Sequence, residues 1–403
     1  MAKNNLSRWV IVGVGFMILG LVYTIRSTIG LMMPIWSEEF GWSRSMISSA
    51  GALCLVVMAA IAPFAGSSVD RYGPRVFVVG GLLAVSLSAV LMATMQSPWM
   101  FFIAFSLLSG IGFGVVAMHV IVATVSPLFD KNKGLAVGIA TAGSTAGQLL
   151  IIPIVAIFLV SFGWRETYFI YAAACLSVAI ICWKLLANTA PKRSTTDEKA
   201  KSTFWADARY LVKKPVFHAV FWSFSLCGFT STGVVETHLM PYLAACGYPT
   251  LDGALSYGFL SGFNMLGMML AGYLSDRINK VFLLVAIYVM RASSFIILLF
   301  VVGDYAALAL FTIMFGIFDY STVTVTAGII VEHLGQKMLG ITMGILAAGH
   351  ALGAAAGAFY GGVLFDLFAR YYEMWIASIA LALVAGVISF AIIFMKPTPR
   401  LVN

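Results

Sequence analysis

Long apolar runs recur along the whole of this sequence, and they limit its possible folds more than any other feature. A helix that crosses the hydrocarbon core of a bilayer needs about 20 predominantly apolar residues. Apolar residues make up 61% of the 403-residue chain and charged residues only 10%, too few to cover a water-soluble domain. We therefore expect an all-α membrane protein. The expected spans are 9–33, 45–66, 75–96, 98–126, 134–161, 166–187, 215–241, 253–275, 280–302, 305–331, 338–365 and 371–395.

Basic residues gather on one side of the expected membrane. With a cytoplasmic amino terminus, 19 of the 24 lysines and arginines lie on the inner face, three on the outer face, and two, Arg26 and Arg291, within spans. This asymmetry is typical of multi-pass proteins with both termini in the cytoplasm. It accounts for the net charge of +8 without a nucleic-acid partner. The first run is long and lacks a small-residue cleavage site, so we expect it to be retained rather than removed as a signal peptide.

The chain carries an internal repeat. The segments GSSVDRYGPR at 66–75 and GYLSDRINK at 272–280 share a glycine, an aspartate and an arginine, each pair separated by 206 residues. Four glycines in the segments that begin at Gly134 and Gly340 match at the same separation. Repeats of this kind build transporters whose binding site lies between the two halves. We expect an N-terminal bundle of six helices at 1–187, a polar cytoplasmic linker at 188–214 and a C-terminal bundle at 215–403.

The segment at 66–75 resembles the signature loop of the major facilitator superfamily, Gly-x-x-x-Asp-Arg-x-Gly-x-Arg between the second and third helices. A weaker copy follows the eighth helix. The resemblance implies the major facilitator fold, with twelve helices in two pseudo-symmetric bundles. It also implies a conformational role for the motif, in which the Asp70 carboxylate accepts a hydrogen bond from a helix end or an arginine and holds the cytoplasmic gate shut. The motif residues are Gly66, Asp70, Arg71, Gly73, Arg75, Asp276 and Arg277.

Within the superfamily, four softer patterns are similar to the bacterial branch of monocarboxylate and oxalate/formate transporters. One departure is present. Such transporters usually carry an arginine on the eighth helix, four residues after an Asp or Asn, but here Met268 stands four residues after Asn264. The four segments are EEFGWSRSMIS at 38–48, GWRETY at 163–168, HLMPYLAACG at 238–247 and AGHALGAAAG at 348–357.

Arg26 is the expected partner of a carboxylate. A charge inside a span costs roughly 2.5–3.5 kcal/mol on insertion scales, so it needs a partner or a task. The resemblance implies that the first helix lines the central cavity, where a guanidinium can form bidentate hydrogen bonds with a carboxylate. Contact with the substrate, a structural ion pair and a snorkelling surface position remain open. Tyr23, one turn earlier, is a second candidate for the same substrate.

Acidic residues in the spans raise the question of proton coupling. Asp319 either forms a static pair with Arg291 or carries a proton, because a buried carboxylate can load and release one. Glu236 is either the coupling acid or a solvated residue of the outer vestibule. We interpret His119, Asn264, Tyr320 and His350 as candidate substrate ligands, with hydrogen-bonded core positions as the alternative.

Several classes of function find no support in the sequence. No GxxxxGK[ST] loop for ATP is present, no nucleophile and base pair recurs, and the five cysteines are scattered without the spacing of a metal site. We therefore expect neither an enzyme nor a cofactor, and a sensor would need a signalling appendage.

The expected function is a secondary carrier, monomeric and located in the bacterial inner membrane. It moves a small organic anion, a monocarboxylate, by alternating access with proton symport. The alternative is a carrier or exporter of a larger, less acidic compound such as a vitamin, siderophore or drug.

Overall fold

The structure is a computed structural model that describes residues 2–129, 132–186 and 197–395. Side chains at 2–7, 62–72, 119, 133 and 197–204 lie outside the described part. The described residues form helices and short connections, with no strand among them. Contacts divide the chain into unit 1, Met1–Ser194 with Pro249–Gly258, and unit 2, Thr195–Tyr248 with Phe259–Asn403.

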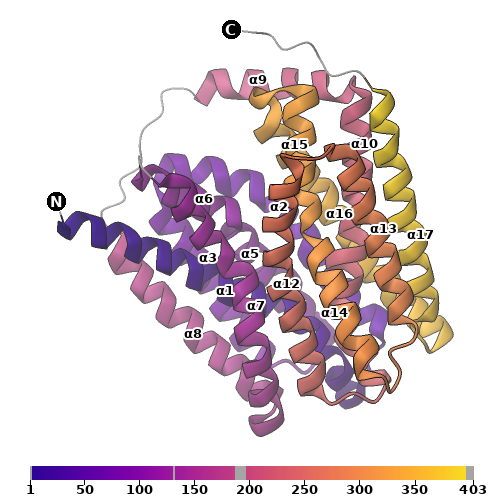
Figure 1. Ribbon diagram of the computed structural model, residues 1–403. Coiled ribbons are helices and arrows are strands. Elements are labelled where there is room, and N and C mark those ends of the chain that lie inside the picture. Colours follow the sequence, from indigo (N-terminus) through magenta and orange to yellow (C-terminus); the bar gives the residue numbers. More distant parts are fainter. Residues whose placement is uncertain (1, 130–131, 187–196, 396–403) are drawn as a thin grey trace. The chain divides into compact units, whose positions relative to one another are not determined.

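Unit 1 consists mainly of long helices (Figure 1). The fourth expected span is divided into shorter pieces, one of them the π-helix η1. The bounds are α1 Ala2–Phe40, α2 Arg44–Tyr72, α3 Pro74–Ala93, α4 Pro98–Phe101, η1 Phe102–Ser109, α5 Gly110–Val115, α6 Met118–Val125, η2 Ser126–Leu128, α7 Lys133–Phe162 and α8 Trp164–Leu185.

Unit 2 begins with a helix in the linker region, which the sequence had not led us to expect. A second π-helix, η4, interrupts the seventh expected span, and the tenth is divided at Tyr320. The first residues of α12, up to Gly258, belong to unit 1 and the rest to unit 2. The bounds are α9 Asp197–Val212, α10 Pro215–Gly228, η4 Phe229–Val235, α11 Glu236–Ala245, α12 Thr250–Ser275, α13 Lys280–Leu298, α14 Tyr305–Asp319, α15 Ser321–Leu334, η5 Gln336–Met338, α16 Leu339–Phe368, α17 Tyr372–Phe390 and η6 Ala391–Phe394.

Eleven helical stretches in the described part are long and apolar enough to cross a membrane. They correspond to eleven of the twelve expected spans. The remaining span is the continuous run from α10 through η4 to α11, which carries five serines and threonines between Ser223 and Thr232. Those hydroxyls make it less apolar than its neighbours, and the structure gives several of them hydrogen-bond partners inside unit 2, as described below.

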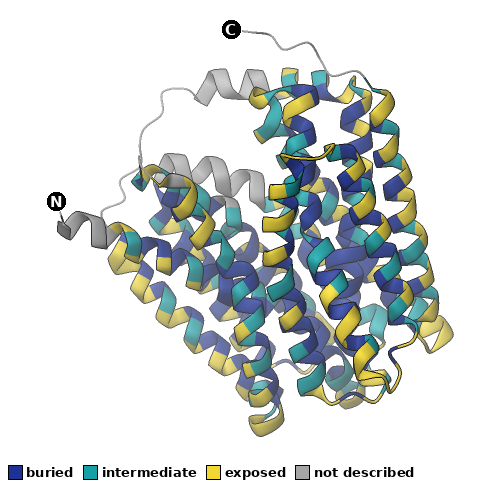
Figure 2. Cartoon of the chain, viewed as in Figure 1, coloured by how far each residue is buried: buried dark blue, intermediate teal, exposed yellow. Residues whose placement is uncertain are grey.

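Lipid-facing surfaces explain the exposed apolar side chains. Along α8 and α17, exposed and buried residues alternate with the helical period (Figure 2). The exposed residues include large apolar side chains such as Ile180 on α8 and Val387 on α17. A helix with one buried and one exposed apolar side is expected at the edge of a membrane bundle, because lipid rather than water meets the outer side.

Glycines allow the closest helix contacts in each unit. In unit 1, a Cβ on Gly147 of α7 would overlap the backbone of Gly20 on α1. In unit 2, a Cβ on Gly353 of α16 would overlap the backbone of Ser225 on α10. Small residues let backbones approach closely, and such contact drives helix association in lipid. The second half of each glycine run in the internal repeat therefore lies where two helices touch: Gly143 and Gly147 in unit 1, and Gly349 and Gly353 in unit 2.

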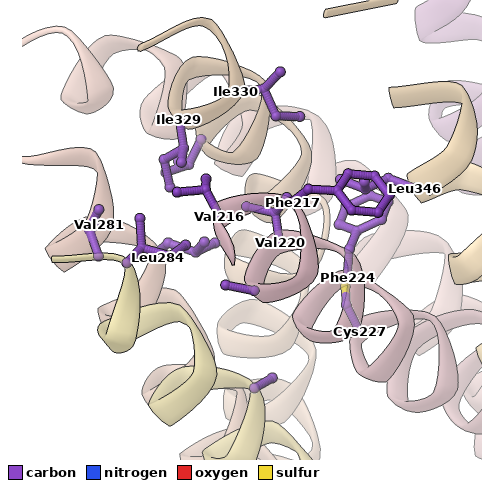
Figure 3. Close-up of a cluster of buried hydrophobic side chains, with 14 of the residues drawn as sticks. Val216, Phe217, Val220, Phe224, Cys227, Val281, Leu284, Ile329, Ile330 and Leu346 are labelled. Carbon is purple, nitrogen blue, oxygen red and sulfur yellow. The ribbon is translucent and has the colours of Figure 1, made fainter. Parts of the chain in front are cut away.

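The core of unit 2 is a cluster of apolar side chains around α10. Val216, Val220 and Phe224 of α10 face residues of α13, α15 and α16 (Figure 3). Cys227 lies one turn beyond Phe224 and is 3% exposed. Beyond Cys227 the interior of the unit becomes polar, and the candidate site lies in this polar part.

Candidate functional site

A charged pair is buried inside unit 2. Arg291 of α13 is 0% exposed and Asp319, the last residue of α14, is 5% exposed. Arg291 Nη2 lies 3.4 Å from Asp319 Oδ1. The pairing considered in the sequence analysis is therefore present. Two opposite charges in a low-dielectric interior attract strongly, and each would be costly to bury alone.

Hydroxyl and thiol groups from the run α10–η4 complete the surroundings of Arg291. Its Nη2 donates to Thr230 Oγ1 at 3.0 Å and to Ser231 Oγ at 2.7 Å, and its Nη1 donates to Cys227 Sγ at 2.8 Å. Ser231 Oγ in turn donates to Asp319 Oδ1 at 2.6 Å. Ser231 thus accepts from the cation and donates to the anion, which strengthens both interactions.

The π-helix η4 supplies two of these partners. Thr230 and Ser231 lie in its first turn, and both are nearly fully buried. A π-turn inserts an extra residue into the helical repeat and is common at functional sites. Cys227, Thr230 and Ser231 were not among the predicted site residues. The available signal was a cluster of polar residues in the middle of an expected span that also contains Glu236.

Glu236 lies close to the same network. It is the first residue of α11 and is 9% exposed. Its Oε1 accepts from Thr232 Oγ1 at 3.1 Å and from Tyr320 Oη at 3.4 Å. An electrostatic interaction also links Glu236 to Asp319. Unit 2 therefore brings together both acids predicted for proton coupling, with Tyr320 in contact with one and adjacent in sequence to the other.

Asn264 holds the chain where α14 ends and α15 begins. Its Oδ1 accepts from the backbone N–H of Tyr320 at 3.3 Å, and Asn264 is 3% exposed. A backbone group at a helix break needs a partner from elsewhere, because the intrahelical pattern is interrupted there. In this structure Asn264 positions Tyr320. Met268, one turn later on α12, is half-buried.

In unit 1, Arg26 and Tyr23 lie together on α1. Both are half-buried, and the Arg26 guanidinium carbon lies 4.6 Å from the centroid of the Tyr23 ring. Arg26 also interacts electrostatically with the buried Cys54 on α2. The next residue, Ser27, accepts from Gln148 Nε2 of α7 at 2.8 Å. Arg26 thus belongs to a polar region formed by α1, α2 and α7.

The signature loop is described only in part. The side chains at 62–72, including those of Asp70 and Arg71, lie outside the described part. The gating role of Gly66, Asp70 and Arg71 therefore stays a prediction. Gly73 has φ +83°, a conformation that glycine adopts readily, and it precedes Pro74 at the start of α3. The Arg75 guanidinium carbon lies 3.7 Å from the centroid of the Trp183 ring on α8.

The second copy of the loop differs from the first. The Arg277 guanidinium carbon lies 3.6 Å from the centroid of the Tyr273 ring, and Arg277 Nη1 donates to the Tyr273 carbonyl at 3.2 Å. Asp276 is exposed beside it. These contacts keep Arg277 on its own segment, whereas Arg75 reaches a neighbouring helix.

Two of the monocarboxylate-like segments meet in unit 1. Glu39, at the end of α1, accepts from Trp164 Nε1 at 2.6 Å and pairs with Arg165 Nη1 at 2.7 Å. Trp164 and Arg165 begin α8, and the guanidinium carbon of Arg165 lies 4.2 Å from the Trp164 ring centroid. The segments at 38–48 and 163–168 therefore tie α1 to α8.

The other two segments belong to α11 and α16 of unit 2, and His238 of the first contacts α16 one residue beyond the end of the second. His238 of α11 is fully buried, and its Nε2 lies 2.8 Å from the carbonyl oxygen of Ala358 on α16. The helix continues through Pro241 to Ala245. The half-buried His350 of α16 lies against Phe224 of α10, with ring centroids 5.1 Å apart. The side chain of His119 lies outside the described part.

No group of three or more His, Cys, Asp or Glu suited to a metal ion occurs among the residues whose side chains are described. What the site in unit 2 offers instead is a buried arginine and two carboxylates, connected by hydroxyl groups. Such a site can stabilise a buried carboxylate through the arginine, and its carboxyl groups can bind or release a proton.

The family model of the Major Facilitator Superfamily matches residues 15–303 and, in a second match, 265–403. The chain belongs to this superfamily. It is a multi-pass membrane carrier of small molecules and not an enzyme. The predicted family and fold class are thus confirmed.

Curated relatives include both bacterial and mammalian proteins. The uncharacterized MFS-type transporter YcxA of Bacillus subtilis (strain 168) is 25% identical over 350 residues, 85% of each chain. Monocarboxylate transporter 2 of Homo sapiens is 22% identical over 405 residues, 94% of this chain and 84% of the relative. Monocarboxylate transporter 11 of Mus musculus is 33% identical over 169 residues, 42% of this chain but only 37% of the relative.

Solved structures agree on the fold. The D-xylose-proton symporter matches with a TM-score of 0.73 and 16% identity over 98% of both chains. A bacterial homolog of the human lysosomal transporter Spinster, in an inward-facing and occupied conformation, matches with a TM-score of 0.72 and 16% identity, covering 96% of this chain and 97% of that one.

Proposed function

We propose that this chain is a proton-coupled carrier of a small organic anion, a monocarboxylate, in the bacterial inner membrane. It works as a monomer by alternating access between the halves 1–187 and 215–403, with both termini and the linker 188–214 in the cytoplasm. Superfamily membership provides the carrier activity, and the names of the monocarboxylate transporter relatives support the substrate class.

The observation that carries the proposal is the half-buried Arg26 on α1. A half-buried guanidinium favours an anionic partner, and a carboxylate can accept bidentate hydrogen bonds from it. Tyr23 lies beside it and can donate a hydrogen bond to the same carboxylate. In this proposal Arg26 binds the substrate carboxylate, a role that the uncharged Met268 on α12 cannot fill. Further candidate contacts of the substrate are Tyr320, His350, His119 and Asn264.

Proton coupling is proposed for Glu236 and Asp319. Carboxyl groups inside the spans of transporters serve as proton relays, because they can bind and release a proton as their partners change. Asp319 is paired with Arg291, whereas hydroxyl groups donate to Glu236. Movement of α14 against η4 would change both environments together, which supports a shared proton site rather than two separate ones.

The experiment is uptake of labelled organic acids into proteoliposomes that contain the full chain, with and without an imposed pH gradient. We expect accumulation of a monocarboxylate that depends on an acidic exterior, and Arg26→Ala to abolish it while the protein stays folded in the membrane. Glu236→Gln should keep exchange of substrate across the membrane but lose the response to the pH gradient. Uptake by Arg26→Ala with unchanged apparent affinity would refute the binding role of Arg26.

Met268 favours a second candidate function, transport of a larger and less acidic compound. A thioether is apolar and flexible and suits contact with a less acidic compound, at a position where an anion carrier of this type would be expected to place an arginine. The agnestins efflux protein AgnL12 of Paecilomyces divaricatus, 26% identical over 336 residues, is a relative named for export. Competition separates the candidates, because an excess of simple monocarboxylates inhibits uptake of the labelled substrate only in the first.

A further inference from the structure

Helix α9 lies crosswise to α10 and α17 within unit 2 (Figure 1). It packs against α10 and α16, and its Leu211 is fully buried in the apolar core of the unit. Packing through Leu211 therefore holds the end of α9 against unit 2.

The outward side of α9 combines apolar and basic side chains. Trp205, Arg209 and Val212 stand at i, i+4 and i+7 and share one face of the helix. All three are exposed, Trp205 at 73% and Val212 at 55%, and the exposed Lys213 follows directly. We refer to these four residues as the α9 surface. Asp207, the acidic residue of this stretch, is half-buried on the other side.

The α9 surface adjoins the lipid-facing side of α10. His218 Nε2, in the first turn of α10, lies 2.7 Å from the carbonyl oxygen of Val212. His218 is exposed, and the next exposed residue on that side of α10 is Trp222, one turn further into the apolar span. The end of α9 therefore lies at the level where a membrane helix begins, which is the level of the lipid headgroups.

We propose that the α9 surface binds the headgroups of anionic phospholipids. The exposed tryptophan suits the boundary between water and hydrocarbon, where its ring is preferred. Arg209 and Lys213 provide the positive charge that attracts basic segments to anionic leaflets. An amphipathic helix with an apolar and basic face commonly lies in the plane of this interface. The proposal concerns the membrane rather than the transported compound, so it stands apart from the proposed function.

The test uses the full chain in nanodiscs of phosphatidylcholine alone and of equal parts phosphatidylcholine and phosphatidylglycerol. A fluorophore attached at Ala206→Cys, in a Cys246→Ala background, reports the position of α9, since Ala206 is exposed and leaves Trp205 in place. We expect quenching by a headgroup nitroxide lipid to rise about twofold with phosphatidylglycerol, and quenching by aqueous iodide to fall.

Charge variants decide whether the α9 surface is responsible. Arg209→Gln with Lys213→Gln should remove the dependence on phosphatidylglycerol, and Arg209→Gln alone should reduce it. The control Lys337→Gln removes an exposed charge from η5 and should leave the dependence unchanged. The same quenching in both lipids, or a full dependence that survives in the double variant, would overturn the proposal.

Discussion

The guanidinium of Arg291 shows how a single buried charge governs its surroundings. It is fully buried and contacts Asp319, Ser231, Thr230 and Cys227. Replacing it with methionine keeps most of the volume but leaves the Asp319 carboxylate without its cation. We predict a loss of about 3–5 kcal/mol in the free energy of unfolding, measured by thermal unfolding of the purified full chain in detergent.

The matched control for this prediction is the double variant Arg291→Met with Asp319→Asn. Removing both charges eliminates the unpaired carboxylate, so most of the lost stability should return. A double variant no more stable than Arg291→Met would mean that the two charges are not coupled.

Gly73 supports a second prediction about a single position. Its φ of +83° strains any residue with a Cβ, whereas a Cβ added at Gly80 on α3 would meet no atom within 4 Å, and Gly80 has no positive φ. Gly73→Ala should cost about 1–3 kcal/mol in the free energy of unfolding. Gly80→Ala should be neutral or slightly stabilising, so equal unfolding midpoints for the two variants would contradict this explanation of the motif glycine.

Helix contacts depend on glycines at particular points along each element. Gly147→Ala and Gly353→Ala would force α7 from α1 and α16 from α10, because each new Cβ meets backbone atoms. We predict a loss of about 1–3 kcal/mol for each, by thermal unfolding. Gly138→Ala and Gly344→Ala on the same helices meet nothing within 4 Å and serve as controls. Destabilisation by the controls as large as by the test variants would refute this account of the two seams.

The elements also show where sequence reasoning succeeded and where it failed. Hydropathy located the expected spans, because a bilayer demands long apolar helices whatever their packing. It gave no sign of η4 or of the division at Tyr320. Both depend on partners distant in sequence, such as Arg291 for Thr230 and Asn264 for the Tyr320 N–H. The linker helix α9 was missed because its packing through Leu211 is a tertiary contact.

For the molecule as a whole, the signature loop at 66–75, together with the spans and the internal repeat, led to the superfamily, and the family match confirms it. The candidate site was predicted less completely. Arg26, Asp319 and Glu236 stood out because charges are rare in spans, whereas Ser231 and Thr230 are ordinary residues until their neighbours are known. Likewise, the contact of Glu39 with Trp164 and Arg165 explains two sequence segments whose connection the sequence did not reveal.

Proton flux driven by the substrate tests the proposed carrier most directly. Proteoliposomes with the full chain and a pH-sensitive dye inside receive an inward gradient of monocarboxylate at equal pH on both sides. The account predicts lumenal acidification faster than in protein-free liposomes, which measure diffusion of the neutral acid, and a return to that background rate in Arg26→Ala. Entry of labelled substrate through the protein without additional acidification would contradict proton-coupled transport of an organic anion.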